Sequence, residues 1–228
     1  VRTDLLDRWQ MALSADAPNR FIINVQDDQV ADVRKYIAQQ GIGEPTLFPM
    51  IRGRLVSLNG KPVTGDDFAG QGERARRQAE REFNLSMAAT LRDDNQVTAG
   101  EFWDADGPGR PEVSVEEEFA QRLGWKLGDT VAFDIAGQPF TATVTSFRSV
   151  DWESFRPNFF VIASPGAMDG FPASWITAVS VPPDKTRFTA GLVSTFPNLS
   201  VIDVDAVLKQ VRSTADQVST VVEVVFYF

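Results

Sequence analysis

Residues 175–204, WITAVSVPPDKTRFTAGLVSTFPNLSVIDV, decide the fold class of this chain. The apolar residues of 175–181 predict a strand, and the two prolines and the aspartate that follow are a helix-start signal. Three apolar residues spaced four apart then occupy one face of the predicted helix. A Pro-Asn break precedes 199–204, which predicts a second strand. The stretch therefore predicts a strand–helix–strand unit.

The same order of elements occurs near the N-terminus. Residues 21–25 are a compact apolar run that predicts a strand. Asp27 and Asp28 are candidate caps of a helix that ends at Gly41. Residues 46–58 are predicted to be extended, and the turn dipeptide Asn59-Gly60 follows them. Two such units side by side predict an α+β, ferredoxin-like arrangement in which two helices cover a sheet.

A different pattern lies between the two units. Residues 73–82 are predicted to form a solvated helix and residues 82–91 a strand. Ser114 and Glu117 have the spacing of a capping box, which predicts a helix from Ser114 that stops at Gly124. The alternation of residues 131–135, the turn after it and the return over 140–152 predict a β-hairpin. Helix and hairpin together predict a compact inserted module.

Both ends of the chain carry apolar stripes at helical spacing. The N-terminal stripe contains Leu5, Leu6, Trp9, Ala12 and Leu13. The C-terminal stripe contains Val207, Val211, Ala215, Val218, Val222 and Val225 and covers more than twenty residues, which is long for a globular helix. Two interpretations stay open for it: a terminal helix packed on the core, or a stalk that continues into a membrane.

The composition excludes several chemistries. The 228 residues include no Cys and no His, so disulfides, thiol nucleophiles and Ser-His-Asp triads are excluded. There are 31 acidic and 22 basic residues, and the net charge of −9 disfavours a nucleic-acid-binding surface. No stretch reaches the roughly 20 consecutive apolar residues that a bilayer span requires.

Seven short segments, taken in order, resemble one family. They are Arg52-Gly53-Arg54-Leu55, Asn59-Gly60-Lys61-Pro62-Val63, Arg81 to Ser86, Ala99 to Trp103, Ser114 to Thr130, Val150-Asp151-Trp152 with Arg156 to Phe160, and Asp203-Val204-Asp205. The chain resembles the periplasmic core domain of FtsX-like, MacB-type ABC transporter permeases, in particular the YbbP-like branch. The resemblance covers nearly the whole chain, and only the segment 65–79 has no match.

The resemblance implies a fold and a domain division. A split porter-like subdomain with stalk helices at both termini is expected over 1–95 and 160–228, and an inserted Sabre-like α/β hairpin module over 96–159. The implied function is non-catalytic: stalk helices would couple cytoplasmic ATP hydrolysis to periplasmic movement of an amphipathic or lipid-like substrate. The expected stalk residues are Leu5, Leu6, Trp9, Val207, Val211, Val218 and Val222.

The resemblance also implies partners and a location. This domain would hold no cofactor, because a separate cytoplasmic ABC ATPase subunit would bind ATP and Mg. The other expected partners are a second permease copy, a periplasmic lysophospholipase/thioesterase-like protein, and the membrane through flanking helices. The expected location is the periplasmic face of the bacterial inner membrane, and no nucleic-acid partner is expected.

Three motifs suggest chemistry but have simpler interpretations. Residues 70–75 match a relaxed dinucleotide-binding pattern, yet no strand precedes them. Residues 104–109 are acidic, but the twelfth position of an EF-hand loop is Val115 instead of Glu, so a surface turn is expected and no metal site. The arginines of 74–81 are interleaved with glutamates, which favours a self-neutralised helix face. No catalytic residue is assigned.

Aromatic residues provide the alternative function. Trp103, Trp152 and Phe155 are candidates for an apolar contact surface, with polar neighbours around the last two. A soluble periplasmic binding or adaptor module that recognises a lipid-like ligand or a partner protein would use such a surface. Most aromatic side chains are simply core, which is the competing interpretation of all three.

Overall fold

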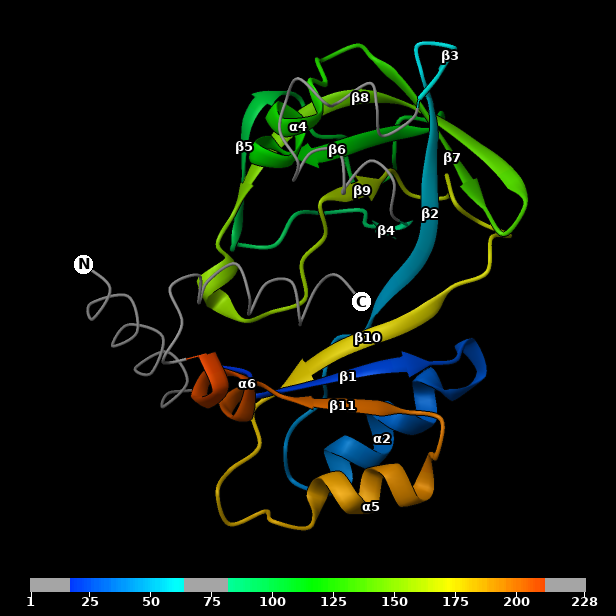
Figure 1. The fold of residues 1–228 in the computed structure, drawn as a ribbon. Coiled ribbons are helices and arrows are strands. Elements are labelled where there is room, and N and C mark those ends of the chain that lie inside the picture. Colours follow the sequence, from blue (N-terminus) through cyan, green and yellow to red (C-terminus); the bar gives the residue numbers. More distant parts are fainter. Residues whose placement is uncertain (1–16, 64–81, 212–228) are drawn as a thin grey trace, which may run out of the picture. The chain divides into compact units, whose positions relative to one another are not determined.

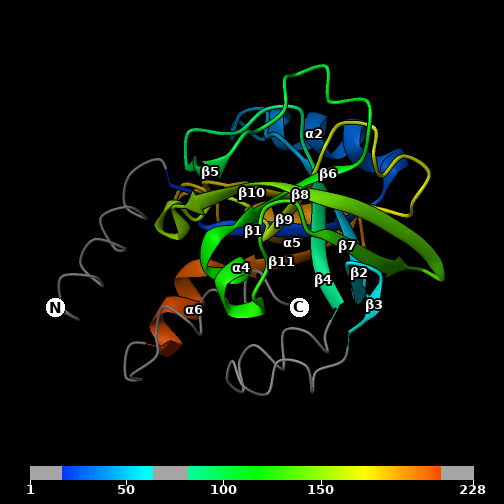
Figure 2. The ribbon, with the colours of Figure 1, turned by 90° about the horizontal axis from the view of Figure 1, so that it is seen from above.

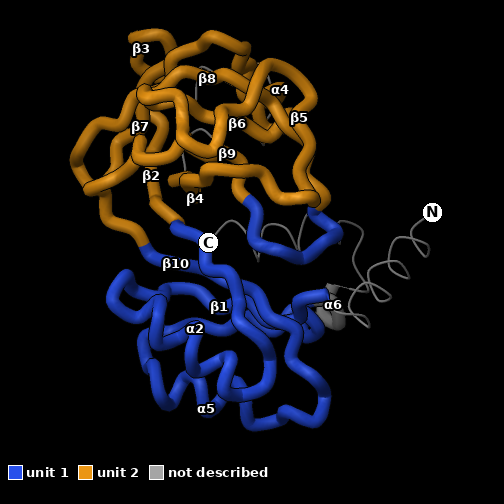
Figure 3. The backbone as a smooth tube through the Cα atoms, turned by 180° about the vertical axis from the view of Figure 1, so that it is seen from behind, with its two compact units in different colours: residues 1–49, 152–158, 174–228 blue, residues 50–151, 159–173 orange. Residues whose placement is uncertain are grey.

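The computed structural model describes residues 17–63 and 82–211, and it is a mixed α+β chain whose core is dominated by sheet (Figure 1). The chain divides into two compact units (Figure 3). Unit 1 comprises residues 1–49, 152–158 and 174–228, and unit 2 comprises residues 50–151 and 159–173.

Unit 1 is built around strand β1 (Arg20–Val25). This strand pairs antiparallel with β10 (Ser174–Val179) on one side and with β11 (Ser200–Asp203) on the other. Helix α2 (Val30–Gln39), which follows the 3-10 turn η1 (Asp27–Gln29), joins the core of this sheet.

The second helix of unit 1, α5 (Phe188–Thr195), packs against the same core, so α2 and α5 lie on one face of the sheet (Figure 1). The buried Val33 and Ile37 of α2 share one apolar cluster with Phe188 and Leu192 of α5. Gly191 of α5 allows Tyr36 of α2 to approach closely, since a Cβ at position 191 would lie 2.7 Å from the tyrosine hydroxyl oxygen.

Both predicted strand–helix–strand segments are confirmed as elements. The first continues from α2 into β2 (Phe48–Leu58), and the second runs β10, α5, β11. The predicted turn after β2 is also confirmed. Asn59 and Gly60 have φ of 53° and 80° and connect β2 to β3 (Lys61–Pro62), as expected when both central residues of a tight hairpin turn need positive φ.

Six strands of unit 2 pair in a closed ring. In order, β2 pairs with β4 (Glu82–Met87), β4 with β9 (Val161–Ala163), β9 with β6 (Glu112–Glu116), β6 with β8 (Gln138–Val150), β8 with β7 (Thr130–Ile135), and β7 with β2. Because each strand of this set has two neighbours in it, the ring has no free edge. Strand β5 (Asn95–Gly100) extends the pairing from the far end of β8. The predicted strand near 82–91 and the predicted hairpin of β7 and β8 are confirmed.

Aromatic rings fill unit 2. Phe119 lies edge-on to Phe83 at 5.2 Å and stacks on Phe160 at 4.8 Å between ring centroids, and Phe133 meets Phe83 at 6.2 Å. Edge-to-face and offset pairs of this kind add to the energy of simple burial. Gly53 of β2 leaves room for this packing, since a Cβ there would lie 2.9 Å from a methyl of Leu85.

The predicted start of the helix after Ser114 is wrong. Ser114 lies in β6, whose five residues are all buried, and its hydroxyl accepts a hydrogen bond from Ser146 at 2.8 Å. Helix α4 is Glu117–Leu123, and its N-cap is Glu116, whose carboxylate accepts the backbone N–H groups of Glu118 and Phe119. The helix packs beside β6 and β8 (Figures 1 and 2). The predicted end is confirmed, because Gly124 is the left-handed C-cap.

The predicted domain division, with one subdomain over 1–95 plus 160–228 and an inserted one over 96–159, remains a prediction. The compact units divide at 49/50, and β2 beyond that point belongs to unit 2 because it pairs with β4 and β7. The predicted N-terminal stalk and the helix at 73–82 fall mainly or wholly outside the described residues. Of the C-terminal stalk, α6 (Val204–Val211) is described. Among the described helices, none combines the length and the apolarity needed to cross a membrane.

Candidate functional site

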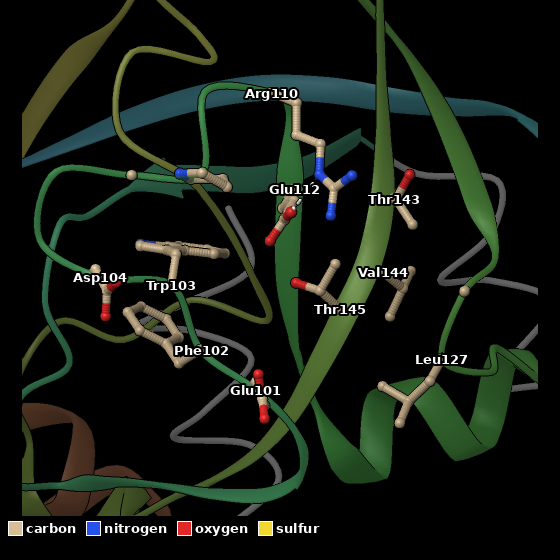
Figure 4. A pocket seen from close by; sticks show the side chains of 13 residues that line it. Glu101, Phe102, Trp103, Asp104, Arg110, Glu112, Leu127, Thr143, Val144 and Thr145 are labelled. Carbon is tan, nitrogen blue, oxygen red and sulfur yellow. Dashed lines mark hydrogen bonds and ion pairs between the residues drawn. The ribbon is translucent and has the colours of Figure 1, made fainter.

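An open depression of about 550 Å³ lies in unit 2 (Figure 4). Its lining comes from four places in the sequence: the loop that leaves β5, the first residue of β6, the turn before β7, and the middle of β8. The lining residues are Glu101, Phe102, Trp103, Asp104, Gly107, Pro108, Arg110, Glu112, Leu127, Gly128, Thr143, Val144 and Thr145. The volume is in the range that ligand sites occupy.

A β-bulge in β8 shapes the floor of the depression. β6 pairs Val113 with Val144 and then Ser114 with Ser146, so Thr145 is an extra residue on β8. Bulges re-aim the groups of the bulged strand and interrupt its pairing. Here the carbonyl of Thr145 accepts the N–H of Glu101 at 3.1 Å. The bulge thus fixes the start of the loop that forms one wall.

Gly100 is what allows that loop to approach β8. Its φ is +73°, and a Cβ at this position would lie 2.2 Å from the carbonyl oxygen of Thr145. No side chain fits such a gap, because real Cβ atoms do not approach a carbonyl oxygen so closely. The close approach of the two backbones therefore requires glycine.

Arg110 and Glu112 form a second wall. The Nε of Arg110 donates to Oε2 of Glu112 at 2.7 Å, and the arginine side chain is 76% exposed while the glutamate is 7% exposed. Ser164 holds both residues from behind, since its hydroxyl accepts the N–H of Glu112 and donates to the carbonyl of Arg110. The pair is therefore held in position, and the rest of the guanidinium faces the open side (Figure 4).

Two aromatic rings form the third wall. The rings of Phe102 and Trp103 lie 4.1 Å apart with an angle of 32° between them. Trp103 is 8% exposed, and its indole N–H donates to the carbonyl of Ala88 at 2.9 Å. That bond fixes the orientation of the ring pair relative to β4, whose end Ala88 follows.

Leu127 completes the rim opposite the aromatic rings. It is 43% exposed, one of the two most exposed large apolar side chains among the described residues. Its turn is fixed by the Asp129 side chain, which accepts the N–H of Lys126, and by Gly128, whose N–H donates to the carbonyl of Val144. The exposed leucine therefore sits on a fixed turn.

A buried polar cluster lies elsewhere in unit 2, around Arg148 of β8. Arg148 is 0% exposed. Its guanidinium donates to Oδ1 of Asn95 at 2.9 Å and to the carbonyls of Phe160 at 3.2 Å and Phe159. These bonds join β5, β8 and the residues just before β9. The guanidinium uses its N–H groups to bind backbone carbonyls of the chain itself, so the role of this cluster is structural.

Burial also sets the charge state of this region. Burial raises the pKa of Glu116 above its ordinary value, and the hydrogen bonds from Phe119 and Glu118 lower it only in part. Burial lowers the pKa of Arg148 to about 9, against the opposing effect of the Glu116 charge. Arg148 therefore stays protonated at neutral pH.

The three predicted aromatic contact residues fare differently. Trp103 lines the depression, although most of its ring is buried. Trp152 is half-buried in the 3-10 turn η3 (Trp152–Ser154). Phe155 is 1% exposed, so it cannot form an exposed contact surface in this conformation; its polar neighbours in the sequence do not imply an exposed ring. The three do not form one surface within a single unit, since the last two belong to unit 1.

The structure describes only some of the other residues and motifs singled out in the sequence. Of the predicted stalk residues, Val207 and Val211 lie in α6, with Val207 half-buried, while Leu5, Leu6, Trp9, Val218 and Val222 lie outside the described residues. The expected turn at 104–109 is confirmed by the bond from the N–H of Gly107 to the carbonyl of Asp104. Over residues 17–63 and 82–211, no group of side chains could hold a metal ion. The 70–75 motif is outside the described ranges.

Sequence reasoning missed Arg148 and the charged residues of the depression. One signal was available for Arg148: the buried face of β8 alternates through Phe140, Ala142, Val144 and Ser146, and position 148 continues that alternation. An arginine on an inward face is a candidate for a buried, hydrogen-bonded cation. No comparable signal joins Arg110 and Glu112 to Leu127, because they meet only through the pairing of β6, β7 and β8.

Comparison with known proteins relates the sequence of this chain to part of a longer protein. No protein-family model matches the chain. Over 211 residues, which are 92% of the chain, the sequence is 41% identical to a protein of Escherichia coli (strain K12). That relative is the "Uncharacterized ABC transporter permease YbbP". The match is 25% of the relative, so the chain spans about a quarter of its length.

Proposed function

We propose that the chain is a non-catalytic, extracytoplasmic domain of an ABC transporter permease. The observation that carries the proposal is the 41% identity to a permease over 92% of the chain. In this role the domain would lie at the periplasmic face of the bacterial inner membrane and belong to the FtsX-like, MacB-type permeases. Its task would be mechanical: it would transmit movement between the membrane and the periplasm while an amphipathic or lipid-like substrate is transported.

The arrangement of unit 1 supports a porter-like, ferredoxin-like subdomain. Strand order β11-β1-β10 with α2 and α5 on one face contains three of the four strands that two strand–helix–strand segments would contribute, because β2 lies in unit 2 from residue 50 onward. The hairpin of β7 and β8 with α4 before it supports a Sabre-like module. Both names are part of the proposal.

A link between the start of β1 and the start of α6 supports a coupling role. The N–H of Val204, the first residue of α6, donates to the carbonyl of Asn19 at 3.0 Å. Arg20 then bridges Asp203 at 3.1 Å and Asp205 at 3.7 Å. A displacement of α6 would therefore pull on the first residues of β1 through these bonds.

The proposal names partners that lie outside this chain. A separate cytoplasmic ABC ATPase would bind ATP and Mg and hydrolyse the nucleotide. A second permease copy would complete the transporter, flanking helices would anchor both copies in the membrane, and a periplasmic lysophospholipase/thioesterase-like protein is a further partner. No cofactor is assigned to this domain.

The test of coupling uses the parent permease assembled with its ATPase in lipid nanodiscs. Val207→Asp combined with Val211→Asp places two charges on the apolar stripe that begins in α6. We expect ATPase activity to fall at least about tenfold, because the stalk faces could no longer pack without burying charge. Val97→Asp is the matched control, since Val97 is a valine that is already 40% exposed on β5.

The readout separates coupling from folding. The double variant must elute as an assembled complex and keep the tryptophan emission of the unchanged protein. Normal ATPase activity in such a complex would contradict the coupling role. Loss of activity in the Val97→Asp control as well would mean that any added charge is harmful, and would remove the support for a specific stalk.

A binding or adaptor role is the second candidate, and the depression of unit 2 is the observation that favours it. Calorimetric titration of the chain with lysophospholipids tests the lipid-like ligand directly. Saturable binding that Trp103→Ala weakens supports this role, while no heat of binding across chain lengths and headgroups removes the lipid ligand.

A further inference from the structure

We propose that the depression of unit 2 is a binding site for an alkyl cation, an ammonium or guanidinium group on an aliphatic stem. The cation would lie between the carboxylates of Glu101 and Asp104, against the ring of Phe102. Its stem would lie toward Leu127. This site is independent of the transport role, because every group that it uses lines the depression of unit 2.

The charge of the lining favours a cation. Glu101, Asp104 and Glu112 contribute three carboxylates, and Arg110 contributes the one guanidinium. Arg110 and Glu112 form an ion pair with each other, so these two largely cancel. Within the described ranges, the side chains of Glu101 and Asp104 have no ion-pair or hydrogen-bond partner. Two uncompensated negative charges therefore face the same open space.

The aromatic wall lies between those two charges. Phe102 is the residue after Glu101 and Trp103 the residue before Asp104, so the ring pair separates the two carboxylates (Figure 4). Aromatic faces attract ammonium and guanidinium groups, and a neighbouring carboxylate adds to that attraction. The bond from Trp103 to Ala88 holds the ring pair in place without a ligand.

The apolar rim explains why the cation should carry a stem. Leu127 is 43% exposed on a turn whose backbone is fixed by Asp129 and Val144. Burying this side chain against CH₂ groups would remove apolar surface from water, which a bare metal ion could not do. The side chains of lysine and arginine have this form, as do small alkylammonium and alkylguanidinium molecules.

The experiment titrates the 228-residue chain with butylguanidinium at low ionic strength and follows the indole N–H resonance of Trp103 by NMR. The resonance is assigned by its loss in Trp103→Phe. We expect a saturable shift, and we expect Glu101→Gln and Asp104→Asn each to weaken binding about two- to fivefold, as for an exposed ion pair. Asp106→Asn is the matched control, because Asp106 is exposed in the same turn and does not line the depression.

A substitution of opposite sign strengthens the test. Arg110→Gln removes the guanidinium and leaves Glu112 uncompensated, so it should tighten butylguanidinium binding by at least about twofold. An unchanged Trp103 resonance without ligand shows that this variant keeps the fold of the site. The source of the cation follows from a second probe, acetyl-Gly-Arg-Gly-amide: tighter binding of the peptide than of butylguanidinium indicates a protein side chain, and equal binding indicates a small molecule.

Three results would overturn the proposal. One is the absence of a saturable shift up to about 50 mM butylguanidinium, a concentration at which even weak sites fill. Another is a shift that Glu101→Gln and Asp104→Asn leave unchanged. The third is preferential binding of butylsulfonate, an anion with the same stem, which would assign the depression to Arg110 instead of the carboxylates.

Discussion

Gly100 is the single residue on which the shape of the depression depends most directly. Its backbone has positive φ and lies so close to the bulge at Thr145 that a Cβ would overlap a carbonyl oxygen. Gly109 provides a natural comparison in the same loop region. Its φ is +72°, yet nothing lies within 4 Å of the position of its missing Cβ.

Alanine substitution at these two glycines separates backbone strain from collision. Gly109→Ala should lower the free energy of unfolding by about 1–2 kcal/mol, the cost of a left-handed alanine. Gly100→Ala should cost about 3 kcal/mol or more, because the collision adds to the same strain. Urea unfolding followed by tryptophan fluorescence measures both. Equal losses at the two positions would mean that the approach of Gly100 to Thr145 does not constrain the fold.

Arg148 marks a limit of sequence analysis at the level of residues. Hydrophobic alternation predicts the strand β8 and the inward face of its residues, but it treats a charged residue as a reason to end the pattern. The structure keeps the pattern because three backbone carbonyls and Asn95 accept the guanidinium hydrogens. Those acceptors lie outside β8, and the sequence separation from Arg148 runs from 11 residues for Phe159 to 53 for Asn95, so the alternation within the strand could not have identified them.

At the level of elements, α4 shows how tertiary pairing overrides a local signal. The serine and glutamate spacing at 114 and 117 is a genuine capping pattern. Strand β6 nevertheless includes Ser114, because β6 pairs with β8 on one side and with β9 on the other. Its Val113 and Val115 are buried. The helix starts two residues later than the strict pattern predicts, and the capping oxygen belongs to Glu116. The elements that sequence predicts well, such as β10, α5 and the β7–β8 hairpin, are those whose turn residues and apolar period agree.

The cap of α4 should give the chain a pH dependence. Glu116 binds its proton more tightly in the folded chain than in the unfolded one, since burial raises its pKa. Its contribution to stability is therefore present at low pH and is lost as pH rises through the raised pKa. Glu116→Gln should remove that loss, so the unfolding free energy of the unchanged chain minus that of the variant should fall as pH rises from about 4 to about 8.

Urea unfolding at several pH values measures this difference, with Glu44→Gln as the control because Glu44 is an exposed glutamate of unit 1. A difference that is constant with pH, or one that grows as pH rises, would contradict the assignment of a raised pKa to Glu116.

At the level of the whole molecule, the two compact units differ in how the chain builds them. Unit 1 is assembled from three separate segments of the chain. Unit 2 comes from the single stretch 50–173, from which only residues 152–158 are assigned to unit 1. The closed ring and its aromatic core come entirely from that single stretch. Sequence analysis predicted the α+β class and most elements, but closure of the ring depends on β2 pairing with β7, which are more than seventy residues apart at their centres. No local pattern encodes that pairing.

Residues 50–173 should fold when produced alone. The ring leaves none of its six strands with an open edge, and its apolar core is internal to the stretch, so the fragment carries its own stabilising contacts. We expect a cooperative urea transition and well-dispersed amide resonances. The variant Phe133→Ala, which opens the aromatic core, should lower the midpoint markedly. A fragment without a cooperative transition would show that unit 2 needs the rest of the chain.

The hydrogen bond between Val204 and Asn19 has a consequence for how this part of the chain can be handled genetically. Because the strand that opens unit 1 and the helix that follows its last strand start within one hydrogen bond of each other, residues 19–204 enter and leave at a single point. Such a segment behaves as a cassette: a host protein would need only a short linker to close the gap after its removal, and relatives could exchange the whole segment without changing the chain before Asn19 or after Val204.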